Sequence, residues 1–150
     1  MELILWRHAE AEDGTPDLER ELTGKGRKQA DKMAAFLRER LPEHTRILVS
    51  PAKRTQQTAL ALTKHFITDA ALGTSATPQN VLDAVGWPDA EGTVLVVGHQ
   101  PTLGQIAARL LADSNAGFSV KKGAVWWLVR KTNEGDYQTS LKLVIAPESL

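Results

Sequence analysis

The sequence predicts an α/β protein: a three-layer αβα sandwich with a mostly parallel central sheet and a C-terminal antiparallel hairpin. Short, continuous apolar runs, typical of strands buried on both faces, alternate with segments whose apolar residues recur at helical spacing. Prolines and glycines separate these segments. Strands that alternate with helices form a mostly parallel sheet that is covered on both faces.

The first half of the chain contains two strand–helix pairs. Residues 3–6 form the first strand, a polar loop follows, and Thr23 is typical of a helix N-cap, with Pro42 ending that helix. Residues 47–49 form the second strand. Ser50 and Pro51 after it resemble an N-cap and a first helical position. The predicted apolar helix faces are Ala30, Met33, Ala34, Leu37 and Leu41, then Thr55, Ala59, Leu62 and Phe66.

The second half begins with a small, polar segment, residues 67–77, which predicts a loop. Thr77 and Pro78 repeat the cap-then-proline signal, and Gly86 ends the short helix that they start. Residues 94–97 form the third predicted strand, and a helix follows Pro101. Its apolar face contains Leu103, Ile106, Ala107, Leu110 and Leu111.

A hairpin is expected at the end of the chain. The strand-like residues 124–129 and 141–145 flank a turn-forming stretch, Asn133-Glu134-Gly135-Asp136. These strands would extend the sheet in the antiparallel sense.

Length and composition narrow the class of protein. A chain of 150 residues predicts a single domain, residues 1–150. Eighteen basic residues balance eighteen acidic ones, which argues against nucleic acid or a membrane surface as the main partner. The chain has no cysteine, which excludes thiol catalysis and disulfides. Its apolar runs are too short for a membrane span. We therefore expect a cytoplasmic protein.

Basic side chains gather where the predicted strands end. Arg7 and His8 end the first strand, Ser50 follows the second with Arg54 close behind, and His99 ends the third. The carboxyl ends of parallel strands meet at one edge, where ligands bind in such sheets. Arginine recognises phosphate with a planar, bidentate fork, and histidine can act as a nucleophile, acid or base. The pattern predicts a phosphate pocket that contains an imidazole.

Other chemistries lack their motifs. The sequence has no Gly-x-x-x-x-Gly-Lys-Ser/Thr loop, no Gly-x-Ser-x-Gly elbow and no His-Glu-x-x-His helix. Two histidines can begin a metal site, but neighbouring arginines repel a cation. No metal site is therefore predicted.

Three motifs resemble those of the histidine phosphatase (phosphoglycerate-mutase-like) superfamily, in the expected order. Arg7-His8-Ala9-Glu10 resembles the opening Arg-His-Gly signature. Residues 50–58, Ser-Pro-Ala-Lys-Arg-Thr-Gln-Gln-Thr, resemble Ser-Pro-x-x-Arg-x-x-x-Thr, and Gly98-His99 resembles the third motif. The short chain, residues 17–26 and residues 97–101 are similar to the SixA-type phosphohistidine phosphatase branch.

The resemblance implies a role for each matching residue. His8 would be the nucleophile that takes the phosphoryl group, and His99 would join it in catalysis. Arg7, Arg54 and His99 would surround the phosphoryl oxygens, and Arg20 would add a contact. No metal or other cofactor is implied, because the arginines neutralise the charge.

The sequence departs from the superfamily most at the leaving-group acid. Larger members carry a glutamate after the second motif, but residues 78–88 offer only Asp83, which is expected to face outward. Glu10 and Glu12 are the substitutes. Ala9 replaces the common glycine, and Glu21 stands where the branch often has proline.

The resulting hypothesis is a metal-independent phosphatase that hydrolyses phosphohistidine on a protein through a covalent phosphohistidine intermediate. Two alternatives remain open: a phosphomonoesterase for sugar or nucleotide phosphates, and a phosphate-binding module without catalysis. Lys53 is close enough to the predicted pocket to attract a phosphoprotein. Lys121 and Lys122 are typical of a solvated turn.

Overall fold

One six-stranded sheet forms the centre of the structure, a computed structural model that describes residues 1–133 and 135–150. The strand order is β3-β2-β4-β1-β5-β6. β3, β2, β4 and β1 run parallel to one another, β5 is antiparallel to β1, and β6 is antiparallel to β5. The strands are β1 (Glu2–Arg7), β2 (Arg46–Val49), β3 (Ile67–Thr68), β4 (Thr93–Gly98), β5 (Val125–Asn133) and β6 (Asp136–Ile145).

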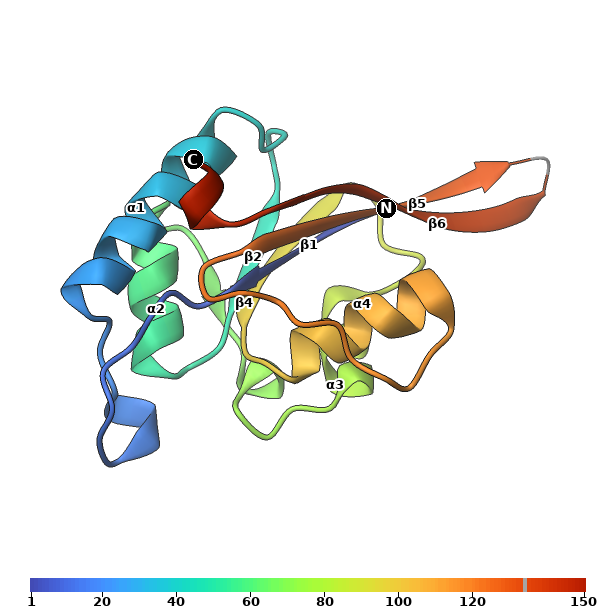
Figure 1. Cartoon of the computed structure of the whole chain (residues 1–150). Coiled ribbons are helices and arrows are strands. Elements are labelled where there is room, and N and C mark those ends of the chain that lie inside the picture. Colours follow the sequence, from blue (N-terminus) through green and yellow to red (C-terminus); the bar gives the residue numbers. More distant parts are fainter. Residues whose placement is uncertain (134) are drawn as a thin grey trace.

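Helices cover both faces of the sheet, as Figure 1 shows. Two pack on one face and two on the other, so the layers are those predicted from the alternation of strands and helices. No helix among the described residues is long and apolar enough to cross a membrane. The helices are α1 (Gly24–Arg38), α2 (Lys53–Leu60), α3 (Pro78–Val85) and α4 (Thr102–Ala112), with short turns η1 (Asp17–Glu19), η2 (Ala70–Leu72) and η3 (Pro147–Ser149).

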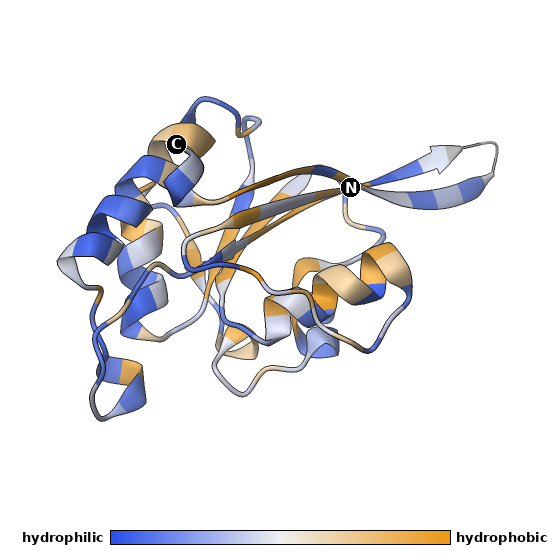
Figure 2. Ribbon diagram, in the orientation of Figure 1, coloured by the Kyte–Doolittle hydropathy of each residue, from blue (hydrophilic) through white to orange (hydrophobic). Residues whose placement is uncertain are grey.

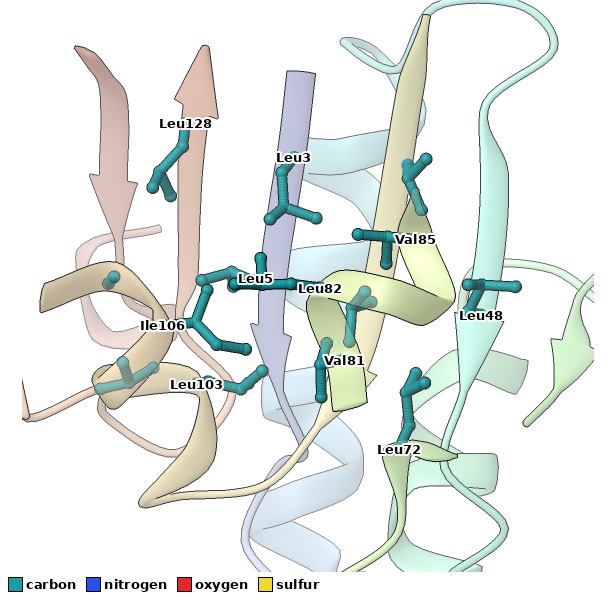
Figure 3. Close-up of a cluster of buried hydrophobic side chains, with 14 of the residues drawn as sticks. Leu3, Leu5, Leu48, Leu72, Val81, Leu82, Val85, Leu103, Ile106 and Leu128 are labelled. Atoms are coloured by element: carbon teal, nitrogen blue, oxygen red, sulfur yellow. The ribbon is translucent and has the colours of Figure 1, made fainter. Parts of the chain in front are cut away.

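Burial on both faces of β1 explains why residues 3–6 are all apolar. Leu3 and Leu5 pack with α3 and α4, the cluster drawn in Figure 3, whereas Ile4 and Trp6 pack with α1 and α2. All four side chains are fully buried, because successive side chains of a strand point to opposite faces. Each such side chain contributes roughly 1.5–3 kcal/mol to folding. The sheet is therefore anchored on both sides at the strand that leads into Arg7 and His8.

The predicted hairpin is confirmed, and it is longer than expected. β5 and β6 pair from Val125 to Asn133 and project beyond the sheet in Figure 1. The projecting part is mostly hydrophilic in Figure 2. Of the predicted turn, Glu134 lies outside the described residues.

Two helix caps follow the sequence signals. The Thr23 hydroxyl accepts a hydrogen bond from the Gly26 N–H, and Thr77 forms a capping box with Asn80. Gly86 ends α3 with φ of +76°, a left-handed conformation that costs glycine little.

Four boundaries differ from the prediction. α1 ends at Arg38, so Leu41 lies beyond it. α2 ends at Leu60, so Leu62 and Phe66, expected on its apolar face, follow the helix. β3 and η2 occupy part of the predicted loop. The sequence did not indicate β3, because a two-residue, exposed strand has no apolar pattern. The α2 cap at Ser50 is wrong: the helix begins at Lys53, and the Ser50 hydroxyl faces a histidine ring instead.

Candidate active site

The register of two parallel strands sets the floor of the site. Arg7 of β1 lies opposite Gly98 of β4, so His8 and His99 follow at the same level. The His8 N–H donates to the Gly98 carbonyl over 3.1 Å, and the two imidazole ring centres are 5.4 Å apart. On the other side of β4, the Ser50 N–H donates to the Val97 carbonyl over 3.1 Å. Three adjacent strand ends thus meet at one point.

A pocket of about 230 Å³ opens at these strand ends. It brings together all five residues that the sequence singled out for catalysis or phosphate binding. The residues that line it are Arg7, His8, Ala11, Asp13, Arg20, Arg54, Thr74, His99, Gln100 and Lys122.

His8 presents an unprotonated nitrogen at neutral pH. Its Nδ1 lies 2.7 Å from the carbonyl oxygen of Ala9. A carbonyl only accepts, so Nδ1 carries the hydrogen and Nε2 of the neutral ring carries a lone pair. Burial lowers the pKa of His8 to about 3; the Ala9 hydrogen bond opposes this, and electrostatic repulsion from His99, Arg54 and Arg7 adds to it. The free ring is therefore neutral at pH 7.

His99 has the opposite tautomer. Its Nε2 lies 2.7 Å from the Ser50 hydroxyl oxygen, and no other acceptor for that hydroxyl is present among the described residues. The hydroxyl therefore donates to Nε2, which places the ring hydrogen on Nδ1. Burial lowers the pKa of His99 to about 4, with a further lowering from Arg54 that Asp17 partly offsets. His99 is a neutral hydrogen-bond donor at pH 7.

The two arginines are each held at one end. Nη1 of Arg7 donates to the Val120 carbonyl over 2.8 Å. Nη1 of Arg54 donates to the Asp17 carbonyl over 2.8 Å, and its Nη2 donates to the Asp17 carboxylate over 3.2 Å. The protein thus fixes both guanidinium groups before any ligand binds.

Three buried side-chain nitrogens have no hydrogen-bond partner within the described part of the chain. They are Nε of Arg7, Nε of Arg54 and Nδ1 of His99. All three residues line the same pocket. A buried donor without a partner costs about 1–3 kcal/mol, more when it is charged. Three of them in one pocket indicate a site for an anion with several acceptor oxygens.

Arg20 stands at the rim of the pocket. Its Nε donates to the Asp17 carboxylate over 3.0 Å, and its Nη1 donates to the Glu12 carbonyl over 3.0 Å. It is more exposed than Arg54 and sits on a loop, so it can reach an anion only from the side.

The acids proposed from the sequence do not line the pocket. The Glu10 carboxylate accepts from the Thr23 hydroxyl over 2.8 Å, at the start of α1. Asp83 is exposed, as expected, and accepts from Gln79 over 2.7 Å. Glu12 is exposed and lies outside the lining. The carboxylate that does line the pocket is that of Asp13.

Five lining residues were not assigned to the site from the sequence: Ala11, Asp13, Thr74, Gln100 and Lys122. Lys122 is exposed, as a turn residue is, yet it also faces the pocket. Gln100 bridges two segments, because its side chain donates to the Phe118 carbonyl and accepts from the Gly104 N–H. Its place beside His99 in the third motif was the available clue.

The donor set does not suit a metal ion. No group of three or more His, Cys, Asp or Glu side chains that could hold one occurs among the residues described. The pocket instead gathers guanidinium groups, which repel cations.

Comparison with known proteins agrees with this geometry. The family model for the histidine phosphatase superfamily (branch 1) matches residues 3–72. A structure named as the phosphohistidine phosphatase SixA of Nakamurella multipartitia is 27% identical, with a TM-score of 0.82 over 97% of this chain and 95% of the other.

The chain is thus similar to the histidine phosphatase superfamily over residues 3–72 and to this phosphohistidine phosphatase structure over nearly its whole length.

Other solved structures share the fold at lower identity. The protein histidine phosphatase SixA, in complex with tungstate, is 22% identical, with a TM-score of 0.83 over 99% of both chains. A variant of the phosphoserine phosphatase of Entamoeba histolytica, in complex with phosphoserine, is 16% identical. Its TM-score is 0.72 over 99% of this chain and 98% of the other. No curated protein matches at a significant level.

Proposed function

We propose that the protein hydrolyses phosphohistidine on a protein substrate by transferring the phosphoryl group to Nε2 of His8. One observation carries this proposal. Three buried nitrogen donors without partners surround a pocket that also holds an imidazole with its lone pair at Nε2. The donors suit phosphoryl oxygens, and the lone pair suits attack on phosphorus.

Binding would precede chemistry. Nε of Arg7, Nε of Arg54 and Nδ1 of His99 would donate to the phosphoryl oxygens. Because the guanidinium groups are already held by Val120 and Asp17, little reorganisation is needed when charge develops in the transition state. Phosphoryl transfer depends chiefly on such positioning and charge stabilisation.

The reaction then has two displacements. Nε2 of His8 forms a bond to phosphorus while the bond to the leaving nitrogen breaks, and the leaving imidazole takes its proton from solvent. The positive charge of the phosphorylated His8 ring is stabilised by its Nδ1–H donating to the Ala9 carbonyl. Water next attacks phosphorus and loses a proton to solvent while the bond to Nε2 breaks, so that neutral His8 and phosphate remain.

The size of the pocket favours a phosphorylated side chain. At about 230 Å³ it is smaller than the roughly 300–1,000 Å³ of pockets that enclose whole small ligands. The phosphoryl group would enter while the rest of the substrate stays over the rim. In addition, an imidazole, whose conjugate acid has a pKa of about 6.5, leaves more readily than an alkoxide. The two SixA structures of similar fold, one with bound tungstate, support the same substrate class.

One observation favours a second candidate, a small-molecule phosphomonoesterase. Asp13 lines the pocket, and a carboxylate there can protonate an alkoxide leaving group. A phosphoserine phosphatase also shares the fold. A binding module without catalysis is disfavoured, because it has no need for an unprotonated Nε2 beside the anion site.

The test compares turnover of a phosphohistidine peptide, an aryl phosphate, phosphoserine and a sugar phosphate, each with and without EDTA. We expect the phosphohistidine peptide to be preferred, EDTA to have no effect, and rapid quenching to trap phosphate on His8. His8→Ala should abolish turnover, whereas His65→Ala, which changes an exposed histidine, should not. Preference for a sugar phosphate, or substantial turnover by His8→Ala, would overturn the proposal.

A further inference from the structure

A second concave surface lies between α1 and the C-terminal turn η3. The two elements are in contact, and Figure 1 shows the end of the chain beside α1. The groove between them has a volume of about 550 Å³, larger than the phosphate pocket. We call it the lysine groove; it is lined by Lys25, Lys28, Gln29, Lys32, Pro147 and Glu148.

The three lysines form one row on α1. Their spacing of three and four residues places them on the same face of the helix. All three are exposed, and none forms an ion pair with another described residue. Figure 2 shows this outer part of α1 as hydrophilic. In a chain whose net charge is zero, the row is a local concentration of positive charge.

The one carboxylate that lines the lysine groove is largely neutralised. Glu148 accepts a hydrogen bond from Nζ of Lys121 over 3.0 Å. This contact holds the pKa of Glu148 below its ordinary value, and the charge of Lys25 lowers it further. Because the ionised Glu148 carboxylate is paired with Lys121, it offsets little of the charge of the three groove lysines.

The lysine groove adjoins the phosphate pocket through residues 120–123. On the pocket side, the Gly123 N–H donates to the His8 carbonyl, and Lys122 lines the pocket. On the groove side, a Cβ at Gly123 would lie 2.9 Å from Cγ of Pro147 and 3.5 Å from Cβ of Gln29. Gly123 has φ of +73°, so glycine is favoured here for both its conformation and its close contacts.

Positive side chains therefore line both sites. They are the arginines and Lys122 in the pocket and the row on α1 in the groove, while Lys121 between them is paired with Glu148. A substrate whose phosphoryl group fills the pocket has the rest of its surface over these side chains. Charges separated by more than about 8 Å are largely screened at physiological ionic strength, so only a partner that extends along α1 gains from all of them.

We infer that the lysine groove docks an acidic surface of the phosphoprotein substrate; this rests on the proposed function for its phosphoryl end. Carboxylates of the partner would contact the row on α1 while the phosphohistidine enters the pocket. Exposed pairs of this kind contribute little each, and their main effect is to raise the association rate. The expected signature is a lower KM for acidic substrates, lost at high salt.

The test uses two phosphohistidine peptides of about twenty residues, long enough when extended to reach from the pocket along α1. One carries glutamates around the phosphohistidine, and the other carries glutamines at the same positions. The protein variants are Lys28→Glu/Lys32→Glu and the matched control Lys64→Glu/Lys131→Glu, which changes the net charge equally at exposed sites away from the groove.

For the wild type and the control we expect kcat/KM to be about tenfold higher for the glutamate peptide at low salt, with equal values at high salt. Lys28→Glu/Lys32→Glu should lose this preference and keep full activity on an aryl phosphate, which also shows that it folds. A wild type without preference, or a preference kept by Lys28→Glu/Lys32→Glu, would overturn the inference.

Binding separates this inference from the proposed function. Affinity of both peptides is also measured by fluorescence anisotropy with His8→Ala as the background, so that no turnover is needed. Tighter binding of the glutamate peptide that depends on Lys28 and Lys32 supports docking even if neither peptide is hydrolysed, in which case only the proposed function fails. Equal binding of the two peptides contradicts docking, whatever the turnover.

Discussion

Arg54 turns the two Nη atoms of its guanidinium toward Asp17 and leaves its Nε without a partner in the described chain. Arg54 is only 4% exposed, whereas the Asp17 side chain is 55% exposed on the turn η1. The other carboxylate oxygen of Asp17 accepts from Nε of Arg20. A guanidinium has two edges for bidentate contacts, and Asp17 occupies one of them. The edge that contains Nε is therefore the one left to bind an anion in the pocket.

Asp17→Asn should weaken substrate binding more than the chemical step. Partial burial raises the pKa of Asp17, but hydrogen bonds from Arg20 and Arg54 outweigh it and keep the carboxyl ionised. Asparagine keeps one acceptor oxygen but loses the charge and the second oxygen, so Arg54 and Arg20 are held less firmly. Since Asp17 is exposed, we expect an effect of about 1 kcal/mol, roughly a fivefold rise in KM with kcat little changed. Steady-state kinetics on the phosphohistidine peptide measures it.

The control for this variant is Glu19→Gln, which removes a charge from the same turn η1 without touching either arginine. It should leave both constants unchanged. Equal effects of the two variants would mean that the loop charge, and not the contact with Arg54, is what matters.

Ser50→Ala should impair the site through His99. Ser50 is fully buried, and its hydroxyl fixes the hydrogen of His99 on Nδ1. Without it, the ring can place the hydrogen on either nitrogen, and we expect kcat/KM to fall about tenfold, or about 1.4 kcal/mol. Kinetics on Ser50→Ala, His99→Gln and the double variant measures the coupling. If the two losses simply add, Ser50 does not act through His99.

The strand ends were predictable and the rim was not. Arg7, His8 and His99 lie at the ends of buried apolar runs. Because the carboxyl ends of parallel strands lie at the same edge of a sheet, the sequence places these residues together. The path of residues 117–122 depends instead on contacts with distant groups, such as Nη1 of Arg7 with the Val120 carbonyl. No local pattern encodes such a contact, which is why Lys122 was expected to be a solvated turn residue.

The same reasoning explains the boundaries that differ. Ser50 followed by proline is a sound local signal for a helix cap. Its hydroxyl instead forms a hydrogen bond with His99, which is 49 residues away. The isolated pair of β3 residues is exposed and joins the sheet through its backbone, which leaves no trace in the apolar pattern. That residues 1–150 form a single domain, and the roles of the site residues, stay predictions.

The two site histidines should make the folded chain less stable as the pH falls from 7 to 5. Their pKa values are about 3 and about 4 when folded, below the ordinary 6.5. Below pH 6.5 these histidines bind protons in the unfolded chain but not in the folded chain. The free energy of unfolding therefore decreases with falling pH until the folded pKa is reached. Each buried ring should cost about 2 kcal/mol at pH 5 relative to pH 7. Urea unfolding at both pH values measures this.

The matched variants for this measurement differ only in burial. His8→Gln and His99→Gln should each reduce the loss between pH 7 and pH 5. His44→Gln/His65→Gln changes two exposed histidines and should leave the loss unchanged. A loss that is the same in His8→Gln and in the wild type would show that His8 titrates normally in the folded chain.

The basicity of the leaving group should govern the rate. Asp13 is the acidic residue that lines the pocket, and because it is exposed we expect it to give the leaving oxygen little help. We expect aryl phosphates to react more slowly as the pKa of the phenol rises. Asp83→Asn should change nothing, since Asp83 faces away and pairs with Gln79. Asp13→Asn should slow alkyl phosphates only. Rates that are independent of the phenol pKa, together with a strong loss in Asp83→Asn, would contradict both expectations.

The residues that line the pocket come from two kinds of backbone segment, regular elements and the connections between them. His8 and His99 follow central strands and Arg54 lies on α2, whereas Asp13, Thr74 and Lys122 come from three separate connections. Connections tolerate insertion and replacement far better than buried strands do. Proteins with this architecture can therefore acquire new substrates by exchanging loops around unaltered strand ends. A chimera with a relative's residues 117–122 should inherit that relative's substrate preference while keeping the proposed nucleophile, His8.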